Sequence, residues 1–366
     1  MNRRHFLQCA LAAGSAAPLL AAVQQSRLDE AADILKSVVE RRQVEAAVLY
    51  VRQDDFVFSR AFGKARDEDA MFLLGSISKP INIAALMTLY DRGEFQLDDP
   101  LHKFIPEFRG ADRAAVTIRH LLSHTSGLPD QVAENAALRK AHAPLAEFVA
   151  HAIRAPVEFA PGSNYQYSSM GILLATHVAE LITKKSILAL TDEAVFRPLG
   201  MRRSAQGLGR FALPDMVAMQ TESAAPESGA GDPTAKDWDW NSPYWRKLGA
   251  PWGGTHASAP DVAKFLAEFL FAAGTIVRPE TARLMIQNQN GSGLTERGLG
   301  FNVGKAAGSE GCSAKTFGHT GSTGTIAWAD PTTRTICVVL TSLPARAVQP
   351  HPRDLVGNRV AKASLG

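Results

Sequence analysis

The chain has 366 residues, of which 46% are hydrophobic and 20% charged, a composition typical of a folded globular protein with a large core. The formal net charge is only +3 and the basic residues are scattered, which argues against a nucleic-acid partner. The 3 cysteines, Cys9, Cys312 and Cys337, are too few for a disulfide framework, and the chain contains no C-x-x-C motif for zinc or redox chemistry.

The chain opens on a pattern typical of an export signal. Arg3 and Arg4 precede Phe6, Leu7 and an apolar run rich in Ala and Leu that reaches Ala22. This resembles the twin-arginine signal, so we expect residues 1–24 to be a signal peptide and the mature protein to be periplasmic or otherwise exported. An uncleaved N-terminal anchor is the alternative. No later segment reaches eighteen uninterrupted apolar residues, so we expect no stable membrane insertion of the mature chain.

Helical and strand patterns follow one another after this leader. Residues 28–42 place apolar side chains at helical spacing. Two apolar, β-prone runs at residues 44–51 and 56–62 lie on either side of Gln53-Asp54-Asp55, which predicts a hairpin. From Ser76 to about Leu199 the pattern is largely helical.

The second half returns to strands. Residues 223–233 are rich in Ala, Gly, Pro, Ser and Glu and predict a long surface loop. Helical spacing resumes over residues 261–272, where Asp261 is a candidate N-cap. Strand patterns then dominate, at residues 316–319, 325–329 and 335–341.

Strands therefore stand at both ends of the chain, with a mostly helical insertion between them. If they share one sheet, the fold is α/β, with an α/β lobe at about residues 25–75 and 250–366 and a helical lobe at about residues 76–249. We expect residues 25–366 to form one catalytic domain, with the cleft between the lobes as the site.

The strongest chemical signal is Ser76 followed by Lys79 at the start of a helical run. A serine hydroxyl needs a base to become a nucleophile, and a lysine three residues later on a helix faces the same side. The lysine must lose its proton to act as base, which requires burial or a positive neighbourhood. S-x-x-K alone is weak, because a capping serine and a solvated lysine have the same spacing.

Four further segments accompany this motif in order. Together the five segments resemble the family of class C β-lactamases, D,D-peptidases and related family VIII-type esterases, which share the penicillin-recognising serine fold. The similarity extends from about residue 28 to residue 342, and its segments are residues 72–79, 117–129, 159–169, 197–201 and 318–321. The resemblance implies a β-lactamase/transpeptidase-like α+β fold, an antiparallel sheet flanked by helices plus a helical lobe.

The resemblance also assigns catalytic roles. Ser76 is implied to be the acylated nucleophile and Lys79 its general base. Tyr167 matches the catalytic tyrosine, which shares in proton transfer and protonates the leaving group. We expect its pKa to be lowered beside the lysine, since free tyrosine titrates near 10. A packed aromatic residue is the structural alternative for Tyr167.

The last matching segment is implied to line the cleft. Thr320 and Gly321 are expected on an edge strand, and the backbone N–H of Ser322 is expected to form the oxyanion hole with that of Ser76. Two substrate-binding positions depart from the β-lactamase pattern: Ser169 stands where asparagine is frequent, and His319 stands where K-T-G has lysine. A histidine is a weaker fixed cation for a substrate carboxylate, which favours an esterase or a peptidase-like hydrolase over a β-lactamase.

Two other features stay open. His120 and His124 stand four apart on a predicted helix, but no third metal ligand is evident, so we expect no metal and no cofactor. Trp238, Trp240, Trp245 and Trp252 cluster before Gly253. They either pack a surface excursion or form an aromatic wall for an acyl group.

We therefore expect a cofactor-free serine hydrolase that cleaves a small-molecule or cell-wall-derived ester or amide through an acyl-enzyme on Ser76. Esterase-like activity is favoured. A class C-type β-lactamase and a D-amino-acid peptidase are the alternatives within the class. A penicillin-binding or sensor protein with little turnover is the alternative outside it. Hydrolysis and acyl transfer use the same acyl-enzyme, and the oligomeric state is left open.

Overall fold

The structure is a computed structural model and describes residues 25–363. The predicted signal at residues 1–24 lies outside the described residues. Within residues 25–363, no helix is long and apolar enough to cross a bilayer.

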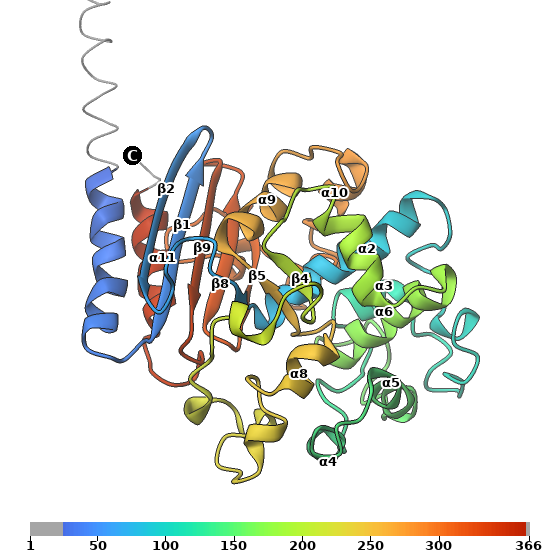
Figure 1. Ribbon diagram of the computed structural model, residues 1–366. Helices are drawn as coiled ribbons and strands as arrows, with labels where there is room; N and C mark the ends of the chain where they lie inside the picture. The colour runs from blue at the N-terminus through green and yellow to red at the C-terminus, as the bar shows by residue number, and fades with distance from the viewer. Residues whose placement is uncertain (1–24, 364–366) are drawn as a thin grey trace, which may run out of the picture.

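A six-stranded antiparallel sheet forms the centre of the molecule, in the order β2-β1-β9-β8-β7-β6. Its strands are β1 (Ala46–Gln53), β2 (Phe56–Gly63), β6 (Asn302–Val303), β7 (Phe317–Gly321), β8 (Thr325–Asp330) and β9 (Thr335–Thr341). Strands β1 and β9 come from opposite ends of the chain and pair directly, with Ala47 opposite Thr341. The terminal strands therefore share one sheet (Figure 1), and the predicted fold class is confirmed.

Both faces of the inner strands β1, β9 and β8 are largely buried, whereas the edge strand β2 is partly exposed. The side chains of β1 alternate between the two faces. Ala46 and Val48 belong to the main core, together with apolar residues of α9 (Ala259–Leu270). Ala47, Leu49 and Val51 belong to a second core, formed with the helix at residues 25–40 and with α11 (Pro352–Ala363). Figure 1 shows these two terminal helices on the same side of the sheet. Burial on both faces explains why the strands read as continuous apolar runs.

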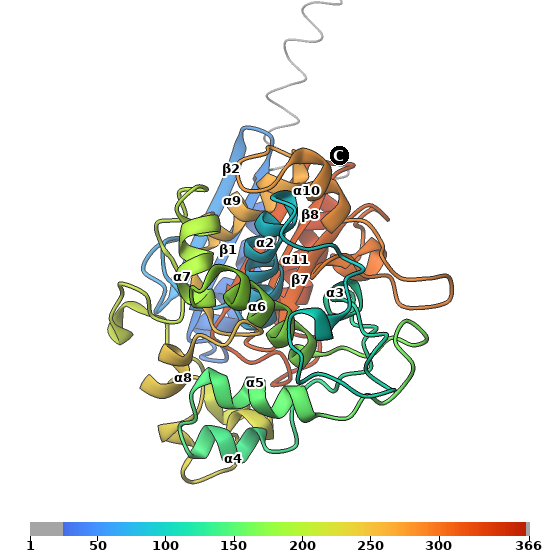
Figure 2. The same ribbon diagram turned by 90° about the vertical axis from the view of Figure 1, so that its right-hand side faces the viewer.

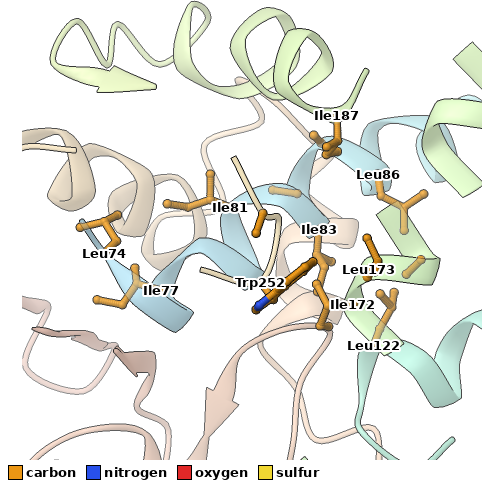
Figure 3. Close-up of a cluster of buried hydrophobic side chains, with 14 of the residues drawn as sticks. Leu74, Ile77, Ile81, Ile83, Leu86, Leu122, Ile172, Leu173, Ile187 and Trp252 are labelled. Carbon is orange, nitrogen blue, oxygen red and sulfur yellow. The ribbon is translucent and has the colours of Figure 1, made fainter. Parts of the chain in front are cut away.

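The second part of the molecule is mostly helical (Figure 2). Its helices are α2 (Ser78–Asp91), α3 (Ile118–Leu122), α4 (Asn135–Lys140), α5 (Leu145–Arg154), α6 (Ser169–Thr183), α7 (Ile187–Thr191) and α8 (Pro243–Leu248), with α10 (Pro279–Met285) following α9. Helix α2 is buried around most of its circumference, and its side chains lie in one apolar cluster with Leu122, Ile172 and Trp252 (Figure 3). This packing fixes α2, whose first turn carries Lys79.

A small sheet that we did not predict joins the two parts. It consists of β3 (Phe72–Leu73), β5 (Thr255–Ala257) and β4 (Ser204–Gln206), with β5 in the centre. The N–H of Leu74 donates to the Thr255 carbonyl at 2.9 Å, and the N–H of Thr255 donates to Ser78 Oγ at 3.0 Å. The short strand β5 thus holds the chain on both sides of Ser76.

One local prediction is wrong, the N-cap of the helix that follows β5. Helix α9 begins at Ala259 with Pro260 in its first turn, and Ser258 occupies the N-cap position that we assigned to Asp261. The Asp261 carboxylate instead accepts from the backbone N–H of Arg203 at 2.6 Å. The predicted loop at residues 223–233 is irregular and mostly at the surface, although it contains a 3-10 turn (Pro226–Ser228) and buries Ala224 and Ser228.

Candidate active site

Ser76 lies in a 3-10 turn (Gly75–Ile77) between β3 and α2, and its side chain is partly exposed. The preceding Gly75 has a φ of +57°, in the left-handed region that favours glycine. A Cβ at Gly75 would lie 2.8 Å from Thr323 Oγ1 and 3.2 Å from the backbone N of Ser322. Glycine therefore allows the end of β7 to approach Ser76, as two N–H groups converging on one oxyanion require.

Lys79 is within hydrogen-bonding distance of Ser76, as the three-residue spacing predicted. Its Nζ lies 3.0 Å from Ser76 Oγ and donates to the Trp252 carbonyl at 2.9 Å. The side chain is fully buried, and this desolvation lowers the pKa of Lys79 to about 7, with Asp130 opposing the shift and Arg297 adding to it. A substantial fraction of Lys79 is therefore unprotonated at neutral pH.

Asn82, one turn along α2, holds the chain that supplies the Trp252 carbonyl. Its amide donates to the Pro251 carbonyl at 3.2 Å and to Gln206 Oε1 at 2.9 Å. Its Oδ1 accepts from the Thr191 hydroxyl at 2.8 Å. A fully satisfied buried amide of this kind fixes the position of the lysine acceptor.

Tyr167 lies against Lys79, with the lysine Nζ 4.7 Å from the ring centroid. Burial raises the pKa of Tyr167, and the opposing effects of Arg297 and of a hydrogen bond to Ser76 do not reverse the shift. Our expectation of a lowered pKa is wrong, because desolvation outweighs the neighbouring cations. The phenol keeps its proton at neutral pH.

His124 also packs against Tyr167, with 4.6 Å between the ring centroids. Helix α3 ends at Leu122 and His124 has a φ of 61°, so His120 and His124 do not share a helix face. His124 Nδ1 accepts from the backbone N–H of Ser168, whereas His120 Nδ1 accepts from that of Thr117. Within residues 25–363, no group of three or more His, Cys, Asp or Glu is arranged to hold a metal.

His319 is buried on β7 and has a direct cationic neighbour that we did not predict. Its Nδ1 lies 2.7 Å from the Thr320 carbonyl, which can only accept, so Nδ1 carries the proton. Its Nε2 then accepts from Nη2 of Arg297 at 2.7 Å. Burial, with Arg297 and Lys79 nearby, holds the pKa of His319 well below its usual range. The fixed positive charge at this position comes from Arg297, not from His319.

Ser169 forms the first residue of α6 and is bound to Asp130. Its backbone N–H and its hydroxyl both donate to Asp130 Oδ1, at 2.9 Å and 2.6 Å. Ser169 and Asp130 line the same cavity as Ser76 and Tyr167. The structure thus places a carboxylate next to a predicted substrate-binding serine.

Strand β7 carries Thr320 and Gly321 beside the Ser76 turn. On β7, the two-residue strand β6 pairs with Phe317 and Gly318. Within residues 25–363, no strand pairs on that side with the end of β7 that carries Thr320 and Gly321. The Thr325 hydroxyl ties the neighbouring strand β8 to the Leu74 carbonyl at 2.7 Å. Ser322 lines the cavity together with Ser76.

A cavity of about 160 Å³ opens beside Ser76. Trp240, Trp245 and Trp252 line it, whereas the indole N–H of Trp238 donates to Thr234. Three of the four clustered tryptophans therefore form an aromatic wall next to the candidate nucleophile. The remaining lining includes Asn135, Arg139, Glu227 and Ser228, which we did not predict.

The structure brings the eight predicted site residues into one region. Four of them line the cavity, namely Ser76, Tyr167, Ser169 and Ser322, whereas Lys79, His319, Thr320 and Gly321 do not. The ring centroids of His319 and Tyr167 are 6.2 Å apart. Sequence reasoning missed Asp130, His124 and Arg297. His124 lies within the distinctive stretch at residues 117–129, and Asp130 directly follows it. That stretch was therefore the sequence signal that could have identified both residues. Arg297 stands in a segment with no motif, so no local signal identified it.

Comparison with known proteins places the chain in a family. The family model described as Beta-lactamase matches residues 29–359. The chain is 34% identical to esterase EstB of Burkholderia gladioli over 321 residues, which cover 78% of this chain and 79% of EstB.

Two solved structures share the fold. A penicillin-binding protein homologue from Caulobacter crescentus superposes with a TM-score of 0.74 at 20% identity, covering 92% of this chain and 97% of that chain. D-amino acid amidase from Ochrobactrum anthropi SV3 superposes with a TM-score of 0.72 at 21% identity, covering 92% and 98%. The chain therefore belongs to the beta-lactamase family of serine hydrolases, which confirms the predicted family, fold and enzyme class.

Proposed function

We propose that the protein hydrolyses carboxylic esters of small acyl groups through an acyl-enzyme on Ser76. The observation that carries this proposal is the buried Lys79, whose Nζ lies 3.0 Å from Ser76 Oγ and whose pKa is lowered to about 7. A base with a pKa near the working pH is available without protein rearrangement.

In the acylation step, neutral Lys79 takes the proton of the Ser76 hydroxyl as Oγ attacks the carbonyl carbon of the ester. The N–H groups of Ser76 and Ser322 stabilise the oxyanion. As the tetrahedral intermediate collapses, the bond to the alcohol breaks. The phenol of Tyr167 gives its proton to the leaving oxygen and recovers a proton from Lys79.

In the deacylation step, a water molecule replaces the alcohol. It loses a proton to the same base and attacks the acyl carbon. The bond to Ser76 Oγ then breaks, and Oγ takes back a proton to restore the starting state. The base pKa near 7 serves both steps, because it lets Lys79 accept and release a proton in turn.

Two observations favour an ester over a β-lactam. The relative EstB is named an esterase and shares 34% identity over most of both chains. The small aromatic cavity beside Ser76 is below the roughly 300–1,000 Å³ of sites for drug-sized ligands, which suits a short acyl chain.

Parallel turnover assays with p-nitrophenyl butyrate and nitrocefin test this proposal, with the Ser76→Ala variant as control. Ester turnover that greatly exceeds nitrocefin turnover and disappears in Ser76→Ala is the expected result. Faster nitrocefin turnover would make the protein a β-lactamase. A long-lived adduct without turnover would favour a penicillin-binding protein.

We also propose that the protein is exported, from the Arg3-Arg4 pair and the apolar run that follows it. The full chain expressed with its leader should appear in the periplasmic fraction. The double variant Arg3→Lys, Arg4→Lys should accumulate in the cytoplasm. Equal distribution of the two proteins would contradict a twin-arginine route.

A further inference from the structure

The cavity beside Ser76 contains a buried cation that the proposed reaction does not use. Arg139 lies on α4, is 3% exposed and lines the cavity together with Ser76. Its guanidinium lies over the Trp245 ring at 3.7 Å from the centroid. The aromatic wall therefore ends in a positive charge.

The hydrogen bonds of this guanidinium are incomplete. Nη1 donates to the Glu227 carbonyl at 2.5 Å. Nε is buried without a partner, and Nη2 has no hydrogen bond within residues 25–363. Nε is closed to solvent, so a carboxylate in the cavity would reach the guanidinium through Nη2, which can form a charge-assisted hydrogen bond.

No carboxylate of the described chain pairs with Arg139. Glu227 and Asp239 are the acidic residues whose charge it feels, but neither is within ion-pair distance. Asp239 Oδ1 is already bound by the N–H groups of Asn241 and Ser242. Asp130, which also lines the cavity, is bound twice by Ser169.

A buried cation without an anion is costly, and burial lowers the pKa of Arg139 to about 10. The cation–π contact and a single carbonyl compensate for only part of that cost. An anionic ligand in the cavity, which Arg139 lines, would supply the missing counter-charge.

We propose that Arg139 binds a carboxylate at the distal end of the acyl group, so that the preferred substrates are monoesters or monoamides of short dicarboxylic acids. This inference rests on the proposed acyl-enzyme function, since the acyl group must occupy the cavity beside Ser76. The tryptophans contact the methylene chain, and Arg139 selects the charged end.

The test compares mono-p-nitrophenyl succinate, glutarate and adipate with neutral esters in which an isopropyl group replaces the distal carboxylate. Such esters can cleave themselves through their own carboxylate, so the rate with Ser76→Ala protein is subtracted. For at least one chain length, kcat/KM for the acid should exceed that for its neutral counterpart by about tenfold or more, the discrimination of one charge-assisted pair.

In Arg139→Met this preference should be lost, whereas Arg139→Lys should retain part of it. Lys140→Met is the matched control, because Lys140 is the adjacent cation on α4 but pairs with Asp232 at 2.6 Å and does not line the cavity. A purely structural role for Arg139 would lower the rates with both esters equally. A wild-type protein that prefers the neutral ester at every length, or an unchanged preference in Arg139→Met, would overturn the proposal.

A binding measurement separates this inference from the proposed function. Calorimetric titration of succinate, glutarate and adipate into Ser76→Ala protein needs no turnover. Binding of at least one of them that is lost in Ser76→Ala, Arg139→Met supports the carboxylate site even if no ester is cleaved. Ester turnover without any dicarboxylate binding or preference would leave the hydrolase intact and refute the site.

Discussion

The Nζ of Lys79 lies 3.0 Å from Ser76 Oγ, at the end of a fully buried side chain. The same nitrogen donates to the Trp252 carbonyl at 2.9 Å, which fixes its direction. Burial supplies the lowered pKa and the carbonyl supplies the orientation. Lys79 can therefore act as the general base that converts the Ser76 hydroxyl into a nucleophile.

The pH dependence of ester hydrolysis should follow Lys79. Because its pKa is lowered to about 7, kcat/KM should rise with pH through about 7 and fall about tenfold per pH unit below it. An exposed lysine would place this limb near 10.4. Initial rates with p-nitrophenyl butyrate from pH 5 to 10 measure it, and a limb near pH 10 would contradict the assignment.

Stability should report the same shift. Between about pH 7 and 10 the unfolded chain keeps the Lys79 proton and the folded chain does not, so wild-type stability gains with rising pH. Relative to Lys79→Met, the free energy of unfolding should increase by at most about 1.4 kcal/mol per pH unit in this window. Urea unfolding of both proteins at several pH values measures the difference. A difference that does not vary with pH would mean that Lys79 titrates alike in both states.

Tyr167→Phe should lower kcat by about 10²-fold or more, because the phenol is the proposed proton donor to the leaving group. The ring contacts with His124 and Lys79 remain, so the fold should be retained. Since burial raises the pKa of Tyr167, the limb near pH 7 should stay in place. Loss of this limb in the variant would instead assign it to the tyrosine.

Gly75→Ala should lower kcat about tenfold or more, because the new methyl group displaces Ser322 N from the proposed oxyanion hole. Gly93→Ala is a matched control: Gly93 also has a positive φ of +75°, but nothing lies within 4 Å of its added Cβ. Both variants should cost about 1 kcal/mol of backbone strain, and only Gly75→Ala should lose activity. Equal rates in Gly75→Ala and Gly93→Ala would contradict a role for the Ser322 N–H in the reaction.

His319→Lys should destabilise the protein by about 1–3 kcal/mol, because Arg297 would lose its acceptor and face a second cation. His319→Gln offers an amide oxygen to Arg297 and should therefore lose less stability than His319→Lys. Denaturant midpoints of the two variants measure this order. The reverse order would show that the lysine of K-T-G fits here without hindrance.

The sequence predicted those parts of the molecule whose local pattern and tertiary environment agree. Strand β9 has the predicted bounds, residues 335–341, because a continuous apolar run is what a strand buried on both faces needs. The Ser76–Lys79 contact followed from helical spacing alone. The start of α9 was misplaced, although Pro260 in its first turn was a signal for it.

What could not be predicted depends on contacts between distant segments. Arg297 reaches His319, and Arg139 reaches the cavity, from segments that carry no motif. The raised pKa of Tyr167 depends on burial, which a list of neighbouring residue types does not contain. Asp130 is bound by Ser169 only because α6 begins beside the turn that carries Asp130.

The most direct test of the central claim is rapid-quench mass spectrometry of the protein during turnover of p-nitrophenyl butyrate, followed by peptide mapping. We predict one transient butyryl group on Ser76, formed and lost at rates that account for turnover, and no adduct in Ser76→Ala. An acyl group on another residue, or undiminished turnover by Ser76→Ala, would contradict the acyl-enzyme account.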